Sequence, residues 1–292
     1  MKIAIYGRQF NDTALPYIQQ VFDNLTQHNA EIYVHHLLEG YLAGRIITNS
    51  YQILHQGEEL KGLIDVVLTL GGDGTLLDMV TLIRDSGIPV IGINFGRLGF
   101  LASVNKNDIA AAIYAVVNRQ FSLDSRELLN IDSDKSIFGT DNFALNDITI
   151  HKRDDAAMIT THVYLNGEIL NSYWGDGIII STSTGSTAYS LSCGGPIIFP
   201  QSNSIAITPI SPHNLNVRPV ILPDSSVLTI DVELRSANYL VSCDSRTAVI
   251  DQTTNFTISK AGFKLNLLRL NNESYLTTLR NKLLWGLDAR NY

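Results

Sequence analysis

Apolar residues in the first 120 positions form short runs, separated by stretches with helical spacing. Four runs predict buried strands: residues 2–6, 31–36, 65–70 and 90–94. Between the first two runs, apolar residues recur every three or four positions, which predicts a helix: Leu15, Ile18, Phe22 and Leu25. Strands that alternate with helices are typical of a parallel sheet. We therefore expect an α/β fold that begins with a doubly wound domain, residues 1–120.

Two more helices and one ambiguous stretch complete this domain. A helix beginning near Leu76 is expected to end by Asp85, before Gly87 and Pro89. Asp108 is placed to cap another helix. Residues 40–62 contain four glycines and show no clear period, so a loop is compatible with them.

The pattern changes near Phe121 to short β-like runs separated by turn residues. Asn166-Gly167, between two apolar runs, predicts a hairpin with a type I′ turn. Further strands are predicted at residues 177–182, 205–210, 227–234, 239–242, 256–258 and 264–270. This pattern predicts a second, mostly antiparallel, β-sandwich-like domain over residues 121–273. A terminal helix within residues 274–292 is expected to join the first domain.

The composition excludes several classes of protein. The 292 residues are 45% apolar and 17% charged, which is typical of a globular chain. A net charge of −7 argues against a nucleic-acid or membrane-surface binder, and no apolar run approaches the length of a membrane span. The apolar N-terminal run is too short for a secretory signal. The two cysteines, Cys193 and Cys243, form no disulfide framework. Together these features favour the cytoplasm.

The first stretch with candidate chemistry is Gly71-Gly72-Asp73-Gly74-Thr75, which follows a predicted strand and precedes a predicted helix. Glycines let a ligand approach the backbone, and free N–H groups at a helix start suit phosphates. The stretch is not a dinucleotide fingerprint, because Leu77 stands where the third glycine belongs, and it lacks the Gly-Lys-Ser/Thr of a Walker loop. A tight turn with a capping Asp is the simpler alternative.

Two more stretches offer polar groups. Asn146-Asp147 presents an amide beside a carboxylate, a pair that can hold sugar hydroxyls or an adenine edge, although an Asx turn at a strand start is the better explanation of this stretch taken alone. In the segment from Gly175 to Pro196, a buried strand ends in eight small or hydroxyl residues, 181–188. These residues could supply hydroxyl and N–H groups, and Tyr189 could stack on a base, whereas a plain loop remains the alternative.

A fourth stretch, residues 241–246, reads by default as a surface turn. Its sharper interpretation is that Arg246 reaches into a site as a hydrogen-bond donor. The histidines show no metal-ligand spacing, and no Gly-x-Ser-x-Gly nucleophile motif is present.

Taken together and in this order, the stretches resemble the NAD kinase family. The matching segments are Gly71–Thr75, Asn146-Asp147, Asp176-Gly177, Thr184–Ser190 and Gly194–Pro196, with a further similarity from Gly92 to Leu101. The glycine-Asp motif alone is shared with phosphofructokinases and diacylglycerol-type lipid kinases. A lipid or sugar kinase of that group therefore stays open as an alternative, as does a non-catalytic dinucleotide sensor.

The resemblance implies transfer of the terminal phosphate of ATP to the 2′-hydroxyl of the adenosine ribose of NAD, which gives NADP. It also implies a divalent metal (Mg²⁺ or Mn²⁺), a site between two domains, and a homodimer or homotetramer without nucleic-acid or membrane partners. Asp73 would be the general base. The positions expected to bind substrate are Asp73, Gly74, Asn146, Asp147, Trp174, Asp176, Thr184, Thr187, Ala188, Tyr189, Ser190, Leu191, Ser192 and Arg246. The phosphate-donor loop would comprise Gly71, Gly72, Gly74 and Thr75, and no side chain is assigned as a metal ligand.

Three positions depart from or vary within the family pattern. Trp174 stands where many relatives carry a basic residue, and Ala157 stands where some carry His. Arg246 occupies a variable position. These departures concern the details of NAD contact and leave the implied reaction unchanged.

Overall fold

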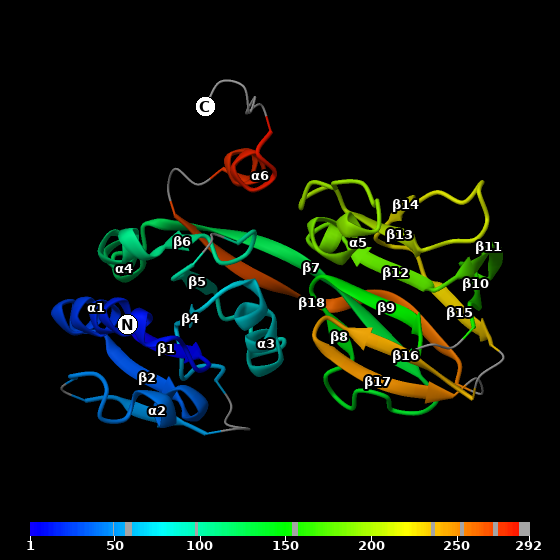
Figure 1. The fold of residues 1–292 in the computed structure, drawn as a ribbon. Helices are drawn as coiled ribbons and strands as arrows, with labels where there is room; N and C mark the ends of the chain where they lie inside the picture. The colour runs from blue at the N-terminus through cyan, green and yellow to red at the C-terminus, as the bar shows by residue number, and fades with distance from the viewer. Residues whose placement is uncertain are drawn as a thin grey trace. The chain divides into compact units, whose positions relative to one another are not determined.

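The computed structural model describes residues 1–48, 50–55, 60–96, 99–153, 157–234, 237–251, 254–270 and 274–285. The chain divides into two compact units, which are Met1–Ser125 with Leu265–Tyr292, and Arg126–Lys264 (Figure 1). The units divide after Ser125 and after Lys264, whereas the sequence placed the boundaries after 120 and after 273. Ala157 is described as an exposed residue, directly after a gap in the described part.

The first unit contains a parallel sheet. Its strands are β1 (Lys2–Gly7), β2 (Glu31–His35), β3 (Gln52–Leu54), β4 (Val66–Leu70), β5 (Val90–Asn94) and β6 (Val104–Asn105). They lie in the order β3-β2-β1-β4-β5, with β6 beside β5. The predicted doubly wound α/β fold is confirmed. After β1 the chain continues to β2 and β3 on one side of the sheet, and after β4 it continues to β5 and β6 on the other side. The carboxyl ends of β1 and β4 therefore mark a topological switch point, where open sheets of this kind bind ligands.

Helices cover both faces of this sheet. The helices described in this unit are α1 (Leu15–Gln27), α2 (His36–Leu42), α3 (Asp73–Ile83), α4 (Ile109–Val117) and, after the last strand, α6 (Tyr275–Leu283), with short 3-10 turns η1 (Asp12–Ala14) and η2 (Lys106–Asp108). The faces of the sheet are covered by α1 to α4. Helices α1 and α4 lie side by side and share one core with α2 and with Ile3 and Ile5 of β1 (Figure 1). The buried residues of α3 are not part of that core. Since side chains alternate along β1, Ala4 and Tyr6 point to the opposite face, which α3 covers.

Two local predictions for this unit were incomplete or wrong. Residues 40–62 are not only loop, because α2 extends into them and β3 lies within them, with 56–59 outside the described residues. Asp108 precedes α4, but its side chain makes no capping hydrogen bond. Asn105 is the residue that caps, since its Oδ1 accepts from the N–H of Asn107 and starts η2. The expected terminal helix is α6, which belongs to the first unit and buries only Leu279 among its described residues.

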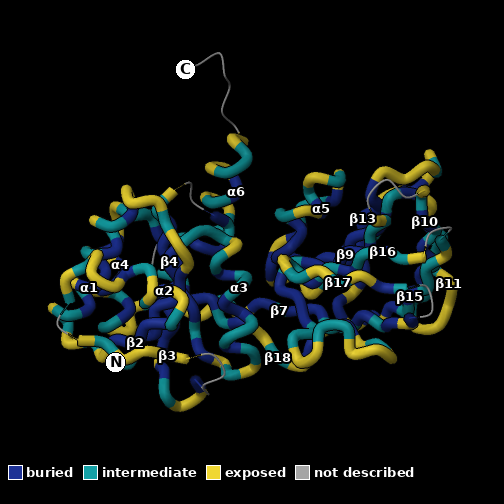
Figure 2. Tube along the Cα trace, turned by 60° about the horizontal axis from the view of Figure 1, so that its bottom comes forward, coloured by how far each residue is buried: buried dark blue, intermediate teal, exposed yellow. Residues whose placement is uncertain are grey.

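The second unit is a sandwich of two antiparallel layers. One layer contains β9 (Asp147–Lys152), β12 (Gly177–Thr182), β13 (Ser204–Ile210), β14 (Val220–Pro223), β16 (Asn238–Cys243) and β17 (Arg246–Asp251), in the order β14-β13-β12-β9-β16-β17. The other contains β10 (Ile159–Leu165), β11 (Glu168–Gly175), β15 (Leu228–Glu233) and the first part of β18 (Phe256–Leu270), with β7 (Phe121–Ser133) and β8 (Phe143–Ala144) beside it. Both layers contribute side chains to one core, and Figure 2 draws the buried positions in dark blue.

The sequence predicted the hairpin at Asn166-Gly167 correctly but did not predict the length of the long strands. Asn166 and Gly167 have φ values of 51° and 89°, as the predicted type I′ turn requires. In contrast, β18 is one strand of 15 residues, although its sequence suggested two short ones, and β7 continues for 13 residues. Each long strand includes a point where the chain passes between the units. Its partners change along its length, so no single apolar period marks it.

Candidate functional site

The turn between β4 and α3 places Asp73 at the switch point of the first sheet. Gly71 has φ +142°, and a Cβ there would overlap the Thr75 side chain, so the turn requires glycine. Gly72 is the N-cap, and Asp73 is the first residue of α3. The glycine-Asp stretch is therefore a strand-to-helix turn, as predicted.

The Asp73 carboxylate does not cap its own helix. Its Oδ2 accepts from the N–H of Phe100 at 2.8 Å, and its Oδ1 accepts from the N–H groups of Leu101 and Ala102 at 3.1 and 2.9 Å. An ionised carboxylate has about four acceptor positions, and N–H groups of described residues fill three of them. Within the described part of the chain, one position on Oδ2 therefore stays available to a hydroxyl proton. The capping alternative is thereby excluded, and the carboxylate is held in a fixed orientation.

The three hydrogen bonds from residues 100–102 to the Asp73 carboxylate, called here the clamp on Asp73, can form because two nearby positions are glycine. A Cβ on Gly99 would overlap the Asp73 carboxylate, and a Cβ on Gly92 would lie 2.8 Å from the Cα of Ala102. Residues 99–102 can therefore approach Asp73 and β5 only because these positions lack side chains. The sequence offered the segment from Gly92 to Leu101 as a family similarity but gave no role to its backbone. Its residues 97 and 98 lie outside the described residues.

In the second unit, the outer face of the six-stranded layer carries small polar side chains. Ile148 and Ile178 belong to the core, so the alternate positions Asp147, Thr149 and Ser181 point to the other face. The segment after β12, with the 3-10 turn η3 (Gly185–Thr187) and the short helix α5 (Tyr189–Ser192), lies over that face. The Ser190 hydroxyl lies 2.8 Å from that of Thr208 and fixes α5 there.

The structure joins the second and third candidate stretches. The Thr182 hydroxyl donates to the carbonyl of Leu145 at 2.6 Å, and the Thr182 N–H donates to the carbonyl of Asn146 at 2.9 Å. Gly185 lies so close to Asn146 that a Cβ on it would overlap the Asn146 carbonyl. Asn146-Asp147 and the hydroxyl-rich run therefore form one local structure, and the loop-only alternative does not describe it.

Asp147 is a buried carboxyl group, 7% exposed. Burial, followed by the nearby charge of Asp244, raises its pKa to about 7, although a hydrogen bond from Thr149 at 3.1 Å acts in the other direction. The pKa of Tyr189 is also raised, first by burial, then by Cys193, and further by Asp147 and Asp176. Asp147, Asp176 and Tyr189 therefore lie within one electrostatic neighbourhood.

The remaining predicted residues of the hydroxyl run differ in exposure. Thr184 and Ser190 are buried, Thr187, Ala188 and Leu191 are half-buried, and Tyr189 and Ser192 are exposed. Sequence reasoning missed Arg126, which is 2% exposed and donates to the Thr184 hydroxyl at 3.1 Å. No pattern around Arg126 indicated this contact, because 58 residues separate the two positions.

Comparison with known protein families decides the identity. A family model described as the ATP-NAD kinase N-terminal domain matches residues 3–121, and one described as the ATP-NAD kinase C-terminal domain matches residues 145–270. The chain belongs to the ATP-NAD kinase family. It is 45% identical over 294 residues to the NAD kinase of Flavobacterium psychrophilum and 43% identical over 292 residues to that of Cytophaga hutchinsonii, with full coverage of both chains in each case.

Solved structures of NAD(H) kinases share the fold. Yeast NADH kinase in complex with NADH superposes with a TM-score of 0.86 at 23% identity, covering 100% of this chain and 89% of that one. An NAD kinase from Archaeoglobus fulgidus in complex with ATP gives 0.74 at 22% identity, covering 97% and 99%. At these identities the likeness supports the architecture.

Trp174, one of the positions that depart from the family pattern, packs against an aromatic side chain. Its ring centroid lies 4.2 Å from that of His213, and the indole is 40% exposed at the end of β11. Two residues on, Asp176 forms an ion pair with Lys152 at 3.0 Å. Trp174 is therefore held by packing against His213, and its expected contact with NAD stays a prediction.

The described contacts of Arg246 are with its own unit, and its expected role in binding NAD stays a prediction. Its guanidinium donates to the backbone carbonyls of Asp141 and Phe143 and lies over the Phe143 ring. The same turn contains Asp244, a buried residue that the sequence reading treated as part of a surface turn. A polar residue in a short turn gives no sequence signal of burial.

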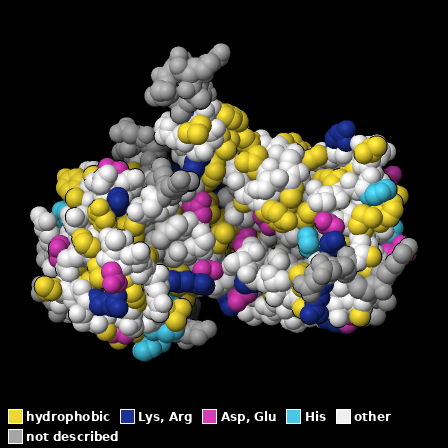
Figure 3. Space-filling view, viewed as in Figure 1, with side chains coloured by type: hydrophobic (Ala, Val, Ile, Leu, Met, Phe, Trp, Pro, Cys, Tyr) yellow, Lys and Arg dark blue, Asp and Glu magenta, His cyan; other side chains and the backbone are white. Residues whose placement is uncertain are grey.

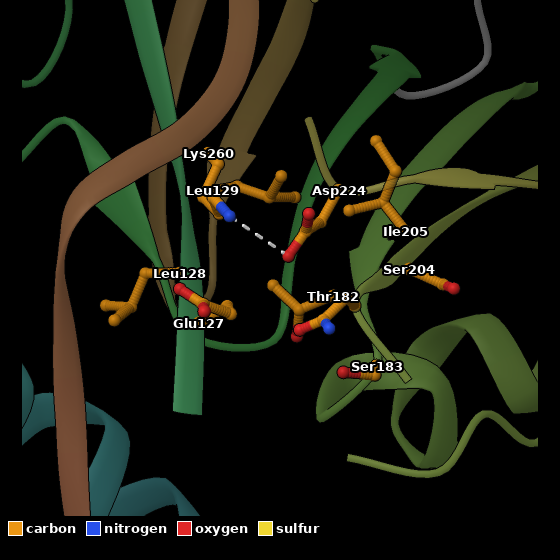
Figure 4. Close-up of a pocket in the computed structure, with 10 residues that line it drawn as sticks. Glu127, Leu128, Leu129, Thr182, Ser183, Ser204, Ile205, Asp224 and Lys260 are labelled. Carbon is orange, nitrogen blue, oxygen red and sulfur yellow. Dashed lines mark hydrogen bonds and ion pairs between the residues drawn. The ribbon is translucent and has the colours of Figure 1, made fainter. Parts of the chain in front are cut away.

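The second unit contains a small cavity that bears on water binding, and the acidic, His and Cys side chains bear on metal binding. A cavity of about 10 Å³ lies among β7, β12 and β13 beside the Lys260–Asp224 ion pair of 3.2 Å (Figure 4). That volume suits about one water molecule. Within the described ranges, no group of three or more His, Cys, Asp or Glu side chains is arranged to hold a metal ion.

The surface charge and the length of the helices bear on whether the chain binds nucleic acid or spans a membrane. On the face drawn in Figure 3, Lys and Arg side chains occur in scattered small groups rather than in one continuous basic patch. Among the described residues, no helix is long and apolar enough to cross a membrane.

Proposed function

We propose that this chain transfers the terminal phosphate of ATP to the 2′-hydroxyl of the adenosine ribose of NAD and so produces NADP. Membership of the ATP-NAD kinase family over nearly the whole chain supports the reaction. The observation that carries the mechanism is the clamp on Asp73, which leaves one carboxylate acceptor position open.

Asp73 acts as the general base in this proposal. A ribose hydroxyl is far less acidic than a carboxylic acid, so Asp73 does not deprotonate it in advance. Phosphoryl transfer passes through a loose transition state, in which positioning and charge stabilisation do most of the work. The aligned carboxylate accepts the proton late, and the clamp from residues 100–102 keeps the open acceptor position in place.

Gly71, Gly72, Gly74 and Thr75 are proposed to receive the donor phosphates at the N-terminus of α3. The Gly71 N–H donates to the carbonyl of Ile93 at 2.9 Å and the Thr75 N–H donates to the carbonyl of Gly72 at 3.0 Å. The N–H groups of Gly72 and Gly74 are therefore the ones proposed to meet the phosphates, since N–H groups at a helix start suit anions. A divalent cation, when bound, neutralises charge on the phosphates. Such an ion would be held largely by the donor phosphates, because the open acceptor position of Asp73 is assigned to the ribose hydroxyl.

The second unit is proposed to bind NAD through Asn146, Asp147, Asp176 and the run from Thr184 to Ser192. With a pKa of about 7, Asp147 can donate or accept a hydrogen bond near neutral pH. The exposed Tyr189 ring offers a stacking surface. That the site lies between the two domains stays a prediction, as do the cytoplasmic location and the homodimer or homotetramer.

The direct test is to supply the purified chain with NAD, ATP and Mg²⁺ and to measure NADP. Parallel reactions with diacylglycerol and with a sugar phosphate separate the other kinases of the glycine-Asp group. ADP release separates a kinase from a non-catalytic sensor. Binding of NAD without NADP formation or ADP release would contradict the proposal.

Gly74 supplies a test of the donor loop. A Cβ at this position meets no atom within 4 Å, so Gly74→Ala should leave the fold intact and stabilise α3 by about 0.5–1 kcal/mol. We expect the KM for ATP to rise roughly tenfold, because the methyl group occupies the approach to the helix N-terminus. Initial rates and thermal melts measure the two effects. An unchanged KM for ATP would remove Gly74 from the donor site.

Asp147 should make stability depend on pH. Its carboxyl keeps its proton in the folded state up to about pH 7, whereas the unfolded chain releases it near pH 4. Between these values the folded state binds more protons, so the free energy of unfolding falls as pH rises. Relative to Asp147→Asn, the wild type should lose about 2–4 kcal/mol across this window. Urea unfolding at several pH values measures it, and parallel curves for the two proteins would contradict it.

A further inference from the structure

Asp244 occupies an unfavourable place for an aspartate. It lies in the turn between β16 and β17 with φ +51°, and its side chain is only 3% exposed. A positive φ and a buried carboxylate both cost free energy unless contacts compensate. The contacts of the Asp244 side chain therefore indicate what the residue contributes.

The Asp244 carboxylate binds the backbone of one segment. Its Oδ2 accepts from the N–H of Leu145 at 2.8 Å, and its Oδ1 accepts from the N–H groups of Asn146 and Asp147 at 2.8 and 3.2 Å. In return, the Asp244 N–H donates to the carbonyl of Asp147 at 3.0 Å. Four hydrogen bonds thus tie the turn to the residues expected to bind NAD.

Arg246 extends the same attachment. Its guanidinium donates to the carbonyls of Asp141 and Phe143, and its Nη2 lies 3.9 Å from Oδ2 of Asp244. The turn therefore supplies an acceptor for the N–H groups of residues 145–147 and a donor for carbonyls just before them. Both side chains act on backbone, which leaves the side chains of Asn146 and Asp147 unconstrained by the turn.

We propose that Asp244 is a positioning residue for NAD binding, which fixes the backbone that presents Asn146 and Asp147 to the dinucleotide. The inference rests on the proposed function. The charge of Asp244 also acts on its neighbour, because after burial it is the next cause of the raised pKa of Asp147. Among the described residues, the other titratable groups that interact with Asp147 are Cys243 at the end of β16, Tyr189 of α5 and Cys193 directly after α5. Arg246 acts on Asp244 instead.

The test is Asp244→Asn, studied in the full chain by NAD binding and by kinetics. An asparagine has one oxygen and one NH₂ group, so at least one N–H of the segment, or the Arg246 guanidinium, must face a donor. We expect the Kd for NAD to rise tenfold or more, with a smaller change in kcat at saturating NAD. We also expect the pH midpoint of NAD binding to move down by about one unit, because the like charge is gone.

Two more variants keep the test decisive. Asp244→Gly keeps the backbone conformation of the turn, because glycine suits the positive φ, and it removes all three acceptor contacts. Asp224→Asn is the matched control, since Asp224 is a buried carboxylate of the same unit whose partner is Lys260. The control should lose stability without a change in the Kd for NAD or in the pH midpoint.

Amide hydrogen exchange separates this inference from the proposed function. Faster exchange at Leu145, Asn146 and Asp147 in Asp244→Gly, together with weaker NAD binding, supports the positioning role. Faster exchange with unchanged NAD affinity and an unchanged pH midpoint overturns it, because the role is then structural only. A wild type that binds NAD but forms no NADP refutes the proposed reaction and leaves this binding test standing.

Discussion

Asp73→Asn should lower kcat by about 10²–10⁴-fold while the fold and the affinity for NAD are retained. The amide cannot accept the hydroxyl proton in the transition state. Its oxygen can still accept from the N–H groups of Leu101 and Ala102, so most of the clamp persists and only the contact with Phe100 is lost. Steady-state kinetics with NAD and ATP-Mg²⁺, together with circular dichroism, measure both parts.

The matched control is Asp108→Asn. Asp108 is exposed, also precedes a helix of the first unit, and makes no capping hydrogen bond, so its kcat should stay close to wild type. Wild-type turnover in Asp73→Asn would end the general-base assignment. An equal loss in both variants would show that any change of charge near a helix start slows the enzyme.

Gly99→Ala should lower kcat by about 10²-fold, although Gly99 carries no reactive group. Its Cβ would overlap the Asp73 carboxylate, so either the carboxylate or the loop of residues 100–102 must shift. Misplacement of a catalytic group by about 1 Å costs a factor of this size. The free energy of unfolding should fall by about 1–3 kcal/mol, as for other overpacked positions. Kinetics and urea unfolding on the same preparation measure the two effects.

Gly96→Ala provides the control within the same loop. A Cβ there lies 3.6 Å from Oδ1 of Asn94, which is ordinary contact, so kcat and stability should stay near wild type. If Gly99→Ala retained wild-type kcat at reduced stability, the orientation of Asp73 would not depend on residues 99–102. If both variants lost activity, the loop would be sensitive to any substitution.

Local sequence signals were sufficient for much of the fold. The apolar runs that became β1, β4 and β5 are continuous because both faces of a parallel sheet are buried. Asn166-Gly167 determined its turn because few residues adopt positive φ at both positions. In contrast, β18 was divided in two, since the partners that bury it change along its length.

For the candidate site too, some features follow from the sequence alone and others only from the tertiary structure. The sequence by itself determined which stretches carry chemistry: glycines and a carboxylate after β4, an amide-carboxylate pair at the start of β9, and a hydroxyl run that begins at the end of β12. Their residue types and order also supported the family.

Only the tertiary structure decided how those residues are held. The clamp on Asp73 comes from backbone N–H groups 27 to 29 residues away, and the anchor of Asn146 and Asp147 comes from Asp244, nearly 100 residues away. Backbone donors look the same in every sequence, and a buried acceptor in a turn resembles an exposed one. Contacts of this kind arise only when folding brings distant strands to the same edge of a sheet.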